Sequence, residues 1–557
     1  MSCAARSLFD NGPPLQRRFS MRALPTTLAP FLDMIGGREK AIERTLVSGG
    51  TLGFVAYLHW VLARPFVFAP IGYDEQFFLY EGYAVGRGLV PYRDFQEFKP
   101  PMTFFANMLS LKLFGLENNG FRYLFVLLAL AGFISIAAAL LSRGVHPLLV
   151  IGLDATMAHH FFDPKFLWGF LGTADFGAIN ITEELGISFF MMAVGVLLYR
   201  TRWERTKLVV GGVLLALSPF SKEPFAVPAI AAWLALMALH QNEGTSSRAW
   251  LRFATYTVLA AVSVAMTWII YLLVTRSTSW YLLELRETFV YANDHNIKYG
   301  LFPNVGFWGT WAENWRRLKS LYVNPAHMEP FIPFFAAATV LWTRRRLLMA
   351  TLVLATYLAG IYAVTIGHGL ASHYYVIAMT GTFFAATMGT VALGLTMDRM
   401  DSRLRLWISG ALCAAGCYAV WPDYQKIEES WASVQTPPLP VDMRTVLFVQ
   451  QHSKRDDRIW NIGLPGLYVF ADRMPASRIP YVHDTLLHIY PGNTDEERLA
   501  PYRAELETHV PKLVVLGPSG ADGRARHMEL LVNPFLAEHH YKRISPADMD
   551  PVYELPE

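Results

Sequence analysis

Long apolar runs recur along most of the chain and predict a bundle of membrane-spanning helices. A helix needs about 20 mostly apolar residues to cross the hydrocarbon core of a bilayer. About eleven segments approach that length, and they are 47–66, 121–141, 145–161, 183–200, 208–221, 224–240, 253–275, 329–342, 347–366, 372–396 and 404–421. The pattern therefore predicts a polytopic α-helical membrane protein.

Arginine and lysine gather on alternate sides of these spans. Cytoplasmic loops of membrane proteins are enriched in both residues. If the N-terminus lies inside, the basic clusters at 200–207, 248–252, 344–346 and 399–405 all face the cytoplasm. The short outer loop 367–371 then contains neither lysine nor arginine. Residues 1–46 are therefore predicted to be a cytoplasmic tail.

Two stretches after the first span fit poorly as membrane crossings. Residues 74–89 are amphipathic, and residues 100–116 are apolar but open with two prolines. If 100–116 crossed the membrane, every later arginine cluster would move to the outer side, against the positive-inside rule. We therefore expect both stretches to be helices along the outer surface, within an outer loop at 67–120.

Residues 422–557 differ in composition from the rest and contain more charges and prolines. Short β-type runs at 457–463 and 512–517 flank a helical stretch near 495–509, which predicts a small α/β domain. The orientation of the spans places this domain outside the cytoplasm. The predicted organisation is thus a tail (1–46), a transmembrane domain (47–421) and an extracytoplasmic domain (422–557).

The composition excludes several classes of protein. Of the 557 residues, 53% are hydrophobic and 17% are charged, whereas ordinary soluble domains have roughly 25% charged residues. The formal net charge of +3 is too small for a surface that tracks nucleic-acid phosphates, so no nucleic-acid partner is expected. The three cysteines form neither a zinc motif nor a disulfide framework.

Ionisable residues gather at the outer ends of the spans. Asp74 and Glu75 directly follow the first span, where a partly solvated carboxylate is placed to act as a base. Helix capping explains the same two acids without any function. Lys99 and Lys222 lie at the outer face against the positive-inside bias. They either snorkel or bind an anion such as the phosphate of a lipid.

Further candidates lie near the outer boundary. Glu183 and Glu184 open a helix, where negative charge is favourable for backbone reasons alone. His368 and His373 are five positions apart, which does not place two ligands on one helix face, so a metal is not expected there. His373 precedes two tyrosines and is typical of an aromatic belt at the interface.

The segment DEQFFLYEGYAVGRGLVPYRDFQEFKPPMTFFANMLSLKLFG, residues 74–115, resembles the first outer loop of the GT-C membrane glycosyltransferases. The likeness is to the branch that contains protein mannosyltransferases and the bacterial aminoarabinose transferases for lipid A. Its shared parts are the acids after the first span, a G-x-x-P-Y turn followed by Asp94, and a Lys-Pro-Pro start to a helix that ends in Phe-Gly. Later parts are similar too: an acid at Glu183 or Glu184, Lys222-x-Pro, and His373-Tyr-Tyr.

The resemblance implies a GT-C fold and an activity. Such enzymes take a sugar from a polyprenyl-phosphate carrier and attach it to an acceptor hydroxyl on the outer side of the membrane. It implies that Asp74 is the base, that Lys99 and Lys222 neutralise the leaving phosphate, and that the reaction inverts the anomeric centre. Supporting or acceptor-orienting roles would then fall to Glu75, Asp94, Glu183, Glu184 and His373.

The resemblance also implies a bacterial inner membrane with the site facing the periplasm. The partners would be a polyprenyl-phosphate sugar, membrane lipid, and an acceptor that is a glycan, a lipid or a protein. No cofactor follows from the motifs, and a divalent metal is left open. Glu223 stands where a glycine is frequent in such enzymes, which sets a carboxylate beside Lys222.

The alternative from another class is a transporter or flippase for an anionic lipid or a lipid-linked saccharide. A transporter is expected to place polar residues at mid-span, on broken helices. In this sequence the polar candidates gather at one face of the membrane instead.

Overall fold

The computed structural model describes residues 29–68, 71–97, 99–162, 182–243, 248–286, 331–344, 347–366, 375–433, 442–480, 494–517 and 528–556, together with Ala312 and Arg316. The chain divides into two compact units, residues 1–50 and 51–557. The described part of the first unit is the beginning of helix α1 (Ala29–Phe68). The contacts reported below lie within the second unit.

Helices occupy all eleven segments that the sequence predicts to span the membrane. They are α1, α4 (Tyr123–Ser142), α5 (Pro147–Phe162), α7 (Thr182–Leu198), α8 (Glu204–Ser221), α9 (Ala226–Glu243), α10 (Ala249–Val274), α13 (Phe331–Arg344), α14 (Leu347–Ile366), α15 (Tyr375–Met397) and α16 (Ser402–Ser433). Among the described residues, seven helices are long and apolar enough to cross a membrane. The chain is therefore mostly helical as predicted, and the number of crossings stays a prediction.

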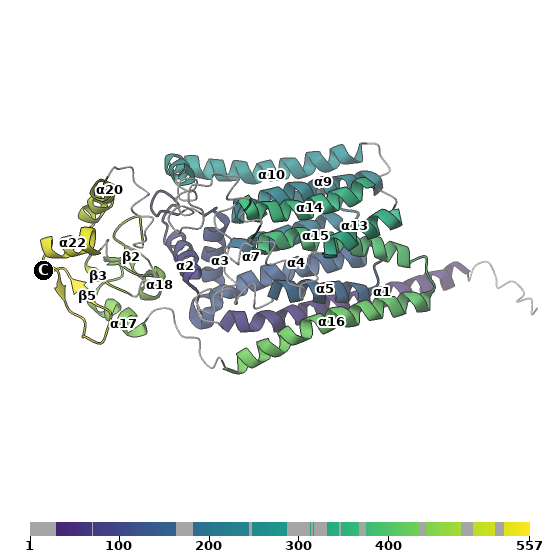
Figure 1. Cartoon of the computed structure of the whole chain (residues 1–557), viewed down its shortest axis with the longest axis horizontal. Coiled ribbons are helices and arrows are strands. Elements are labelled where there is room, and N and C mark those ends of the chain that lie inside the picture. Colours follow the sequence, from purple (N-terminus) through teal and green to yellow (C-terminus); the bar gives the residue numbers. More distant parts are fainter. Residues whose placement is uncertain are drawn as a thin grey trace, which may run out of the picture. The chain divides into compact units, whose positions relative to one another are not determined.

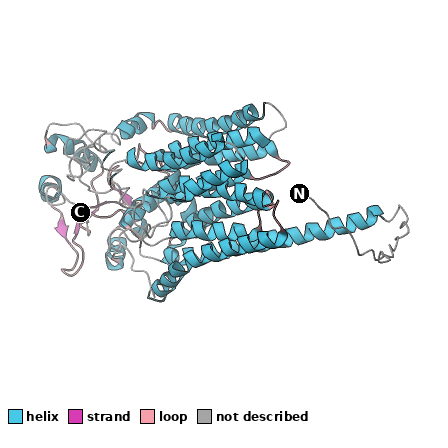
Figure 2. Cartoon of the chain, turned by 45° about the vertical axis from the view of Figure 1, so that its right-hand side comes forward, coloured by secondary structure: helices cyan, strands magenta, loops and turns pink. Residues whose placement is uncertain are grey.

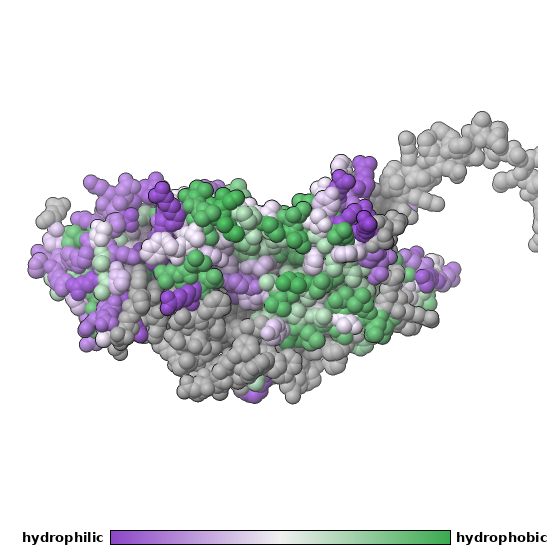
Figure 3. All heavy atoms as spheres, turned by 90° about the horizontal axis from the view of Figure 1, so that it is seen from above, coloured by the Kyte–Doolittle hydropathy of each residue, from purple (hydrophilic) through white to green (hydrophobic). Residues whose placement is uncertain are grey.

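The bundle has an apolar core and an apolar exterior. Phe133 of α4, Phe161 of α5 and Phe383 of α15 belong to one buried cluster. Large apolar side chains also stay exposed, such as Leu259 on α10 and Trp407 on α16. Figure 3 shows hydrophobic side chains gathered over the bundle, with more hydrophilic surface over the C-terminal sheet region. A helix that is apolar on its outer face as well suits a lipid solvent.

Two shorter helices follow α1 and run across the ends of the bundle helices (Figure 1). They are α2 (Tyr73–Gly86) and α3 (Met102–Phe114), which correspond to the stretches 74–89 and 100–116. The helices approach closely at Gly82, where an added Cβ would lie 2.4 Å from the Cβ of Asn107. This contact holds the helix that begins near Asp74 against the helix that follows Lys99. Their position on the outer membrane surface stays a prediction.

The C-terminal residues form a small mixed sheet with helices around it (Figure 2). The strand order is β2-β1-β3-β5-β4; β1 pairs in parallel with β2 and β3, and β5 pairs antiparallel with β3 and β4. The strands are β1 (Arg458–Asn461), β2 (Met474–Pro475), β3 (Leu513–Val515), β4 (Lys542–Arg543) and β5 (Val552–Glu554). The helices are α17 (Met443–His452), α18 (Gly466–Ala471), α20 (Asp495–Thr508) and α22 (Asn533–Glu538), with a short helical turn at Met528–Val532. Strands β1 and β3 lie within the predicted β-type runs, and the location of this region outside the cytoplasm stays a prediction.

Helix α2 and the C-terminal sheet region share one core. Leu79 and Tyr80 of α2 are buried in the same cluster as Leu467 and Tyr468 of α18. The rings of Tyr80 and Tyr468 lie 5.5 Å apart. The Tyr83 hydroxyl donates a hydrogen bond to Asp472 at 2.8 Å. The C-terminal region therefore packs directly on the helix that carries Asp74.

Candidate functional site

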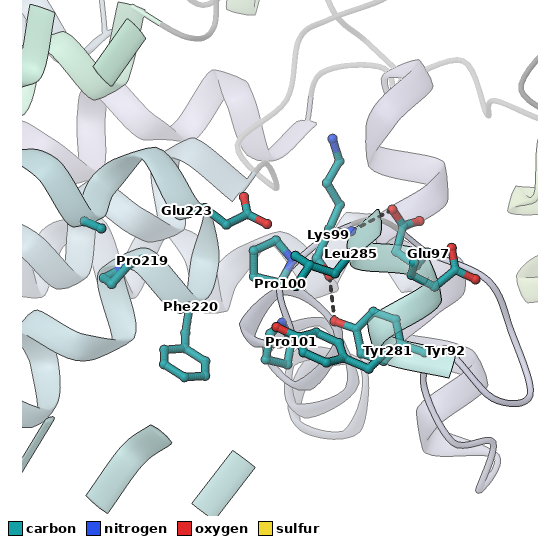
Figure 4. Close-up of a pocket in the computed structure, with 12 residues that line it drawn as sticks. Tyr92, Glu97, Lys99, Pro100, Pro101, Pro219, Phe220, Glu223, Tyr281 and Leu285 are labelled. Carbon is teal, nitrogen blue, oxygen red and sulfur yellow. Dashed lines mark hydrogen bonds between the residues drawn. The ribbon is translucent and has the colours of Figure 1, made fainter. Parts of the chain in front are cut away.

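A cavity of about 240 Å³ lies where the outer loop meets the ends of α8 and α9. Its polar lining consists of Tyr92, Glu97, Lys99, Glu223, Tyr281 and Glu284, and the rest is apolar or proline. In Figure 4 the Lys99 side chain extends between the Glu97 and Glu223 carboxylates. One ammonium group and several carboxylates thus converge on a small, partly enclosed space.

The backbone around Lys99 is fixed by two hydrogen bonds. The Lys99 amide donates to the Glu97 side chain at 3.1 Å, and the Lys99 carbonyl accepts from the Tyr92 hydroxyl at 2.8 Å (Figure 4). Tyr92 itself has φ +67°, a left-handed conformation that is strained for a large side chain and is common at functional sites. Pro100 and Pro101 follow directly and restrict the backbone further. The backbone at Lys99 is therefore held in place before any ligand binds.

Asp74 and Lys99 share a neighbour that the sequence analysis did not single out. Glu81 lies seven positions after Asp74, on the same face of α2, and is buried. The charges of both Asp74 and Lys99 act on Glu81. Burial, followed by the nearby charge of Glu97, raises the pKa of Glu81 well above its ordinary value. The raised pKa favours the neutral form of Glu81.

Lys222 lies close to Glu223, another acid of the cavity lining. It caps the C-terminal end of α8 and forms a buried ion pair with Glu183 of α7. The Thr182 hydroxyl donates to the second carboxylate oxygen of Glu183 at 2.7 Å. Both Lys222 and Lys99 act electrostatically on Glu223, which lines the cavity. Lys222 and Asp74 are thus not among the described residues that line the cavity.

Glu75 differs from its neighbour Asp74 in its surroundings. Asp74 is partly exposed at the start of α2, whereas Glu75 is fully buried. The Glu75 carboxylate accepts from Arg122 Nε at 2.7 Å, and Arg122 Nη1 donates to the Phe66 carbonyl at 2.8 Å. This ion pair joins the end of α1, the start of α2 and the start of α4. The arrangement favours a structural role for Glu75.

Asp94 is also engaged in local structure. Its carboxylate pairs with Arg93 at 2.7 Å and accepts from the Val90 amide at 2.8 Å. Arg93 in turn donates to the Thr275 carbonyl at 2.8 Å. Burial acts to raise the pKa of Asp94, but the bonds from Arg93 and Val90 outweigh it and lower that pKa. Asp94 therefore stabilises the turn that leads to Lys99.

Of the remaining two candidates, the structure describes only Glu184, which is not among the residues that line the cavity. Glu184 is buried in α7, and its Oε1 atom has no hydrogen-bond partner among the described residues. His373 lies outside the described residues. Within the part of the chain that the structure describes, no group of three or more His, Cys, Asp or Glu side chains is arranged to hold a metal ion.

The structure adds acids that the sequence analysis left without a role. Glu97 and Glu284 line the cavity, and Glu81 lies behind Glu97. A signal for Glu81 was present in the sequence, because a glutamate seven residues after Asp74 lies on the same face of a helix. Glu284 belongs to the segment that follows α10, and no spacing in the sequence connects it to Lys99.

An apolar groove continues from the cavity along the bundle. It has a volume of about 400 Å³ and lies between α8, α9 and α10. Pro219, Phe220 and Ala226 line both the cavity and the groove, so the two spaces adjoin. The groove is otherwise lined by residues such as Leu215, Ile230 and Val258. A charged end and a long apolar end together fit an amphiphilic ligand.

Comparisons with known proteins give matches among solved structures only. No family model matches the chain, and no curated protein matches it. Oligosaccharyltransferase AglB from Archaeoglobus fulgidus, in complex with an inhibitory peptide and a dolichol-phosphate, matches over 92% of this chain and 74% of its own, with 13% identity and a TM-score of 0.45. ArnT from Cupriavidus metallidurans bound to undecaprenyl phosphate matches over 91% of this chain and 97% of its own, with 14% identity and a TM-score of 0.47. ArnT from the same organism in the apo state matches over 91% of this chain and 98% of its own, with 13% identity and a TM-score of 0.48. All three matches are below 15% identical and have TM-scores below 0.5.

Proposed function

We propose that this protein is a membrane glycosyltransferase that moves a sugar from a polyprenyl-phosphate carrier to an acceptor hydroxyl. The observation that carries the proposal is the cavity with Lys99, which adjoins an apolar groove between α8, α9 and α10. A phosphate could bind to the Lys99 ammonium group in the cavity, and an isoprenoid chain could pack in the apolar groove. The site would face the periplasm of a bacterial inner membrane.

In the proposed reaction Asp74 accepts the proton of the acceptor hydroxyl. The acceptor oxygen forms a bond to the anomeric carbon while the bond from that carbon to the phosphate oxygen breaks. The electron pair of the broken bond stays on the phosphate, and attack from the opposite face inverts the anomeric centre. A phosphate leaves without protonation, so the site needs positive charge rather than a general acid.

Lys99 and Lys222 would supply that positive charge. Lys99 borders the cavity directly, and Lys222 lies beside Glu223 with Glu183 as its partner. Charge-assisted hydrogen bonds are stronger in a partly dry site than in water. The acids around Lys99 would accept hydrogen bonds from sugar hydroxyls. The sugar and the acceptor are left open.

The test of this proposal is Asp74→Asn in the full-length protein reconstituted in lipid vesicles with polyprenyl-phosphate-linked sugars extracted from membranes. Release of free polyprenyl phosphate should fall by at least about 100-fold, as expected when a general base is lost. Glu117→Gln is the control, because Glu117 follows α3, is exposed and is not among the residues that line the cavity. Full activity of Asp74→Asn would remove Asp74 from the role of base.

A lipid transporter remains the second candidate because of one observation in the bundle. His59 of α1 lies 3.1 Å from both carboxylate oxygens of Asp154 of α5, and both side chains are buried. Ionisable pairs within membrane helices are often functional. Movement of undecaprenyl phosphate between leaflets of the same vesicles, lost in His59→Phe but retained in Asp74→Asn, would favour transport over transfer.

A further inference from the structure

One arginine of the C-terminal region reaches the wall of the cavity. Arg478 follows β2 and is buried. Its Nη2 atom donates to the Tyr92 carbonyl at 2.9 Å and to the Glu284 carboxylate at 2.7 Å. Tyr92 and Glu284 both line the cavity. A residue more than 50 positions beyond the last predicted span therefore touches the pocket wall from behind.

Several segments of the chain contact Arg478. The Gln96 amide donates to the Arg478 carbonyl at 2.8 Å, and the Gln96 side chain donates to Glu284 at 3.3 Å. The guanidinium lies 4.2 Å from the ring centroid of Trp280, within cation–π range. The Arg478 amide donates to Glu505 of α20 at 3.0 Å. Residues 92–96, the segment 280–284 and the sheet region thus meet at one side chain.

The charges at this junction depend on each other. Burial raises the pKa of Glu284 to about 7, while the charge and hydrogen bond of Arg478 and the hydrogen bond of Gln96 act in the opposite direction. The charge of Glu97 acts to raise the pKa of Glu284 further. Loss of Arg478 would remove an ion pair from Glu284, which would raise the pKa of that carboxyl, and would release the Tyr92 carbonyl.

Tyr92 connects this junction to Lys99. Its carbonyl is held by Arg478, and its hydroxyl donates to the Lys99 carbonyl at 2.8 Å. Because Tyr92 has a strained positive φ, its conformation persists only while surrounding contacts hold it. The contact from Arg478 is one of those. Two hydrogen bonds therefore lead from the C-terminal region to the backbone of Lys99.

We propose that Arg478 is a positioning residue for the cavity, so that the C-terminal region completes the site instead of merely covering it. Through Tyr92 it fixes the backbone of Lys99, and through Glu284 it fixes the facing wall. The effect on ligand binding rests on the proposed function, in which Lys99 meets the phosphate of the donor. The effect of Arg478 on the backbone of Tyr92 and Lys99 does not rest on the proposed function.

The test uses Arg478→Ala in the full-length protein, with Arg473→Ala as the matched control. Arg473 is equally buried in the same region, and among the described residues its side chain donates to Ser453, Gln450, Ala471 and Asp472. Hydrogen–deuterium exchange of residues 91–99 is measured in nanodiscs, together with the affinity for undecaprenyl phosphate. Arg478→Ala should raise exchange in 91–99 and weaken binding by about tenfold or more. Arg473→Ala should lower the melting temperature without either effect.

Three outcomes would overturn the inference. Exchange of residues 91–99 could stay unchanged in Arg478→Ala, or it could rise equally in Arg473→Ala, which would indicate general loosening of the region. If Arg478→Ala does not fold, Arg478→Lys is measured in its place. Lysine can pair with Glu284 but lacks the planar guanidinium donors of arginine, so hydrogen–deuterium exchange of residues 91–99 should rise by a smaller amount. No rise in exchange would reject the positioning role of Arg478. If the wild type itself does not bind undecaprenyl phosphate, the proposed donor fails, while the exchange comparison still decides the role of Arg478.

Discussion

Two adjacent acids at the start of α2 show how surroundings decide the role of a residue. Asp74 is partly exposed and acts electrostatically on Glu81 beside the cavity wall. Glu75 is fully buried and neutralised by Arg122. A buried charge is tolerated only when it is paired and hydrogen-bonded. Glu75 is therefore expected to affect folding, and Asp74 is expected to affect transfer.

Arg122→Ala should destabilise the protein strongly. It would leave the buried Glu75 charge without its ion-pair partner, and the Phe66 and Val67 carbonyls would each lose a hydrogen bond from Arg122. The expected cost is about 3–5 kcal/mol, seen as a large fall in the melting temperature. The double variant Glu75→Gln/Arg122→Ala should recover part of that loss, because no lone charge remains. A melting temperature close to that of the wild type in Arg122→Ala would contradict this account.

The pH dependence of stability should contain a contribution from Glu284. Burial raises its pKa from 4.5 to about 7 in the folded protein. A raised pKa means that the folded state holds a proton that the unfolded state has released. The stabilisation is therefore complete below about pH 4.5 and is lost as the pH rises through about 7. Melting temperatures of the wild type should fall over this range relative to Glu284→Gln, and parallel curves would argue against it.

The sequence indicated some of the site but could not supply all of it. Lys99 was singled out because a lysine at the outer face needs an explanation, and it does line the cavity. The roles proposed for Asp74, Lys99 and Lys222 stay predictions. Glu284 and Arg478 could not be found, because they are brought to Tyr92 by contacts between segments about 190 and 390 residues away in sequence. Such contacts depend on the tertiary fold and leave no local pattern.

At the scale of elements, the packing of α2 on α3 sets the geometry of the outer loop. Gly82 permits the close approach, since a Cβ there would also lie 2.6 Å from the carbonyl carbon of Asn107. Backbone atoms cannot move aside as a flexible side chain can. Any side chain at position 82 must therefore push the two helices apart.

Gly82→Ala should lower both stability and transfer. Overpacking of this kind typically costs about 1–3 kcal/mol, and the shift would separate Asp74 from Lys99. Gly86→Ala on the same helix is the control, because its added Cβ would lie 3.7 Å from Met108, an ordinary contact. Thermal unfolding and transfer rates of both variants check this. Equal melting temperatures and transfer rates in the two variants would mean that the close approach at Gly82 affects neither stability nor transfer.

The groove between α8, α9 and α10 permits a test of the proposed lipid chain. Ala216→Trp would fill part of the groove, whereas Val209→Trp would add the same side chain to an exposed site on the same helix. The affinity for undecaprenyl phosphate should fall by about tenfold or more in the first variant and stay unchanged in the second. Affinity for a short-chain isoprenyl phosphate should be less affected. Equal affinities in both tryptophan variants would exclude the groove as the site of the chain.

Hydrophobic pattern predicted the elements better than their ends. All eleven predicted spans correspond to helices, since each had enough apolar residues to be recognised. Helix α16 continues through Pro422 to Ser433, beyond the predicted end at 421, where rising polarity suggested a boundary. A polar sequence can continue a helix beyond an apolar span, so polarity alone does not mark where the helix ends.

At the scale of the whole molecule, the outer loop and the C-terminal region form one structure around the cavity. They share the core of Leu79, Tyr80 and Tyr468 and the hydrogen bonds of Tyr83 and Arg478. The sequence analysis expected a separate C-terminal domain, and its boundary stays a prediction. The packing explains why a polar region follows the bundle: it supports the segment that carries Lys99.

The central claim is that Lys99 binds the phosphate of a polyprenyl carrier beside Asp74. The most direct measurement is the affinity for undecaprenyl phosphate in nanodiscs, compared among the wild type, Lys99→Ala, Lys112→Ala and Asp74→Asn. Lys112 lies near the end of α3 on its exposed side and controls for loss of positive charge. We predict a loss of at least about tenfold in Lys99→Ala alone. Wild-type affinity in Lys99→Ala, or an equal loss in Lys112→Ala, would contradict the account.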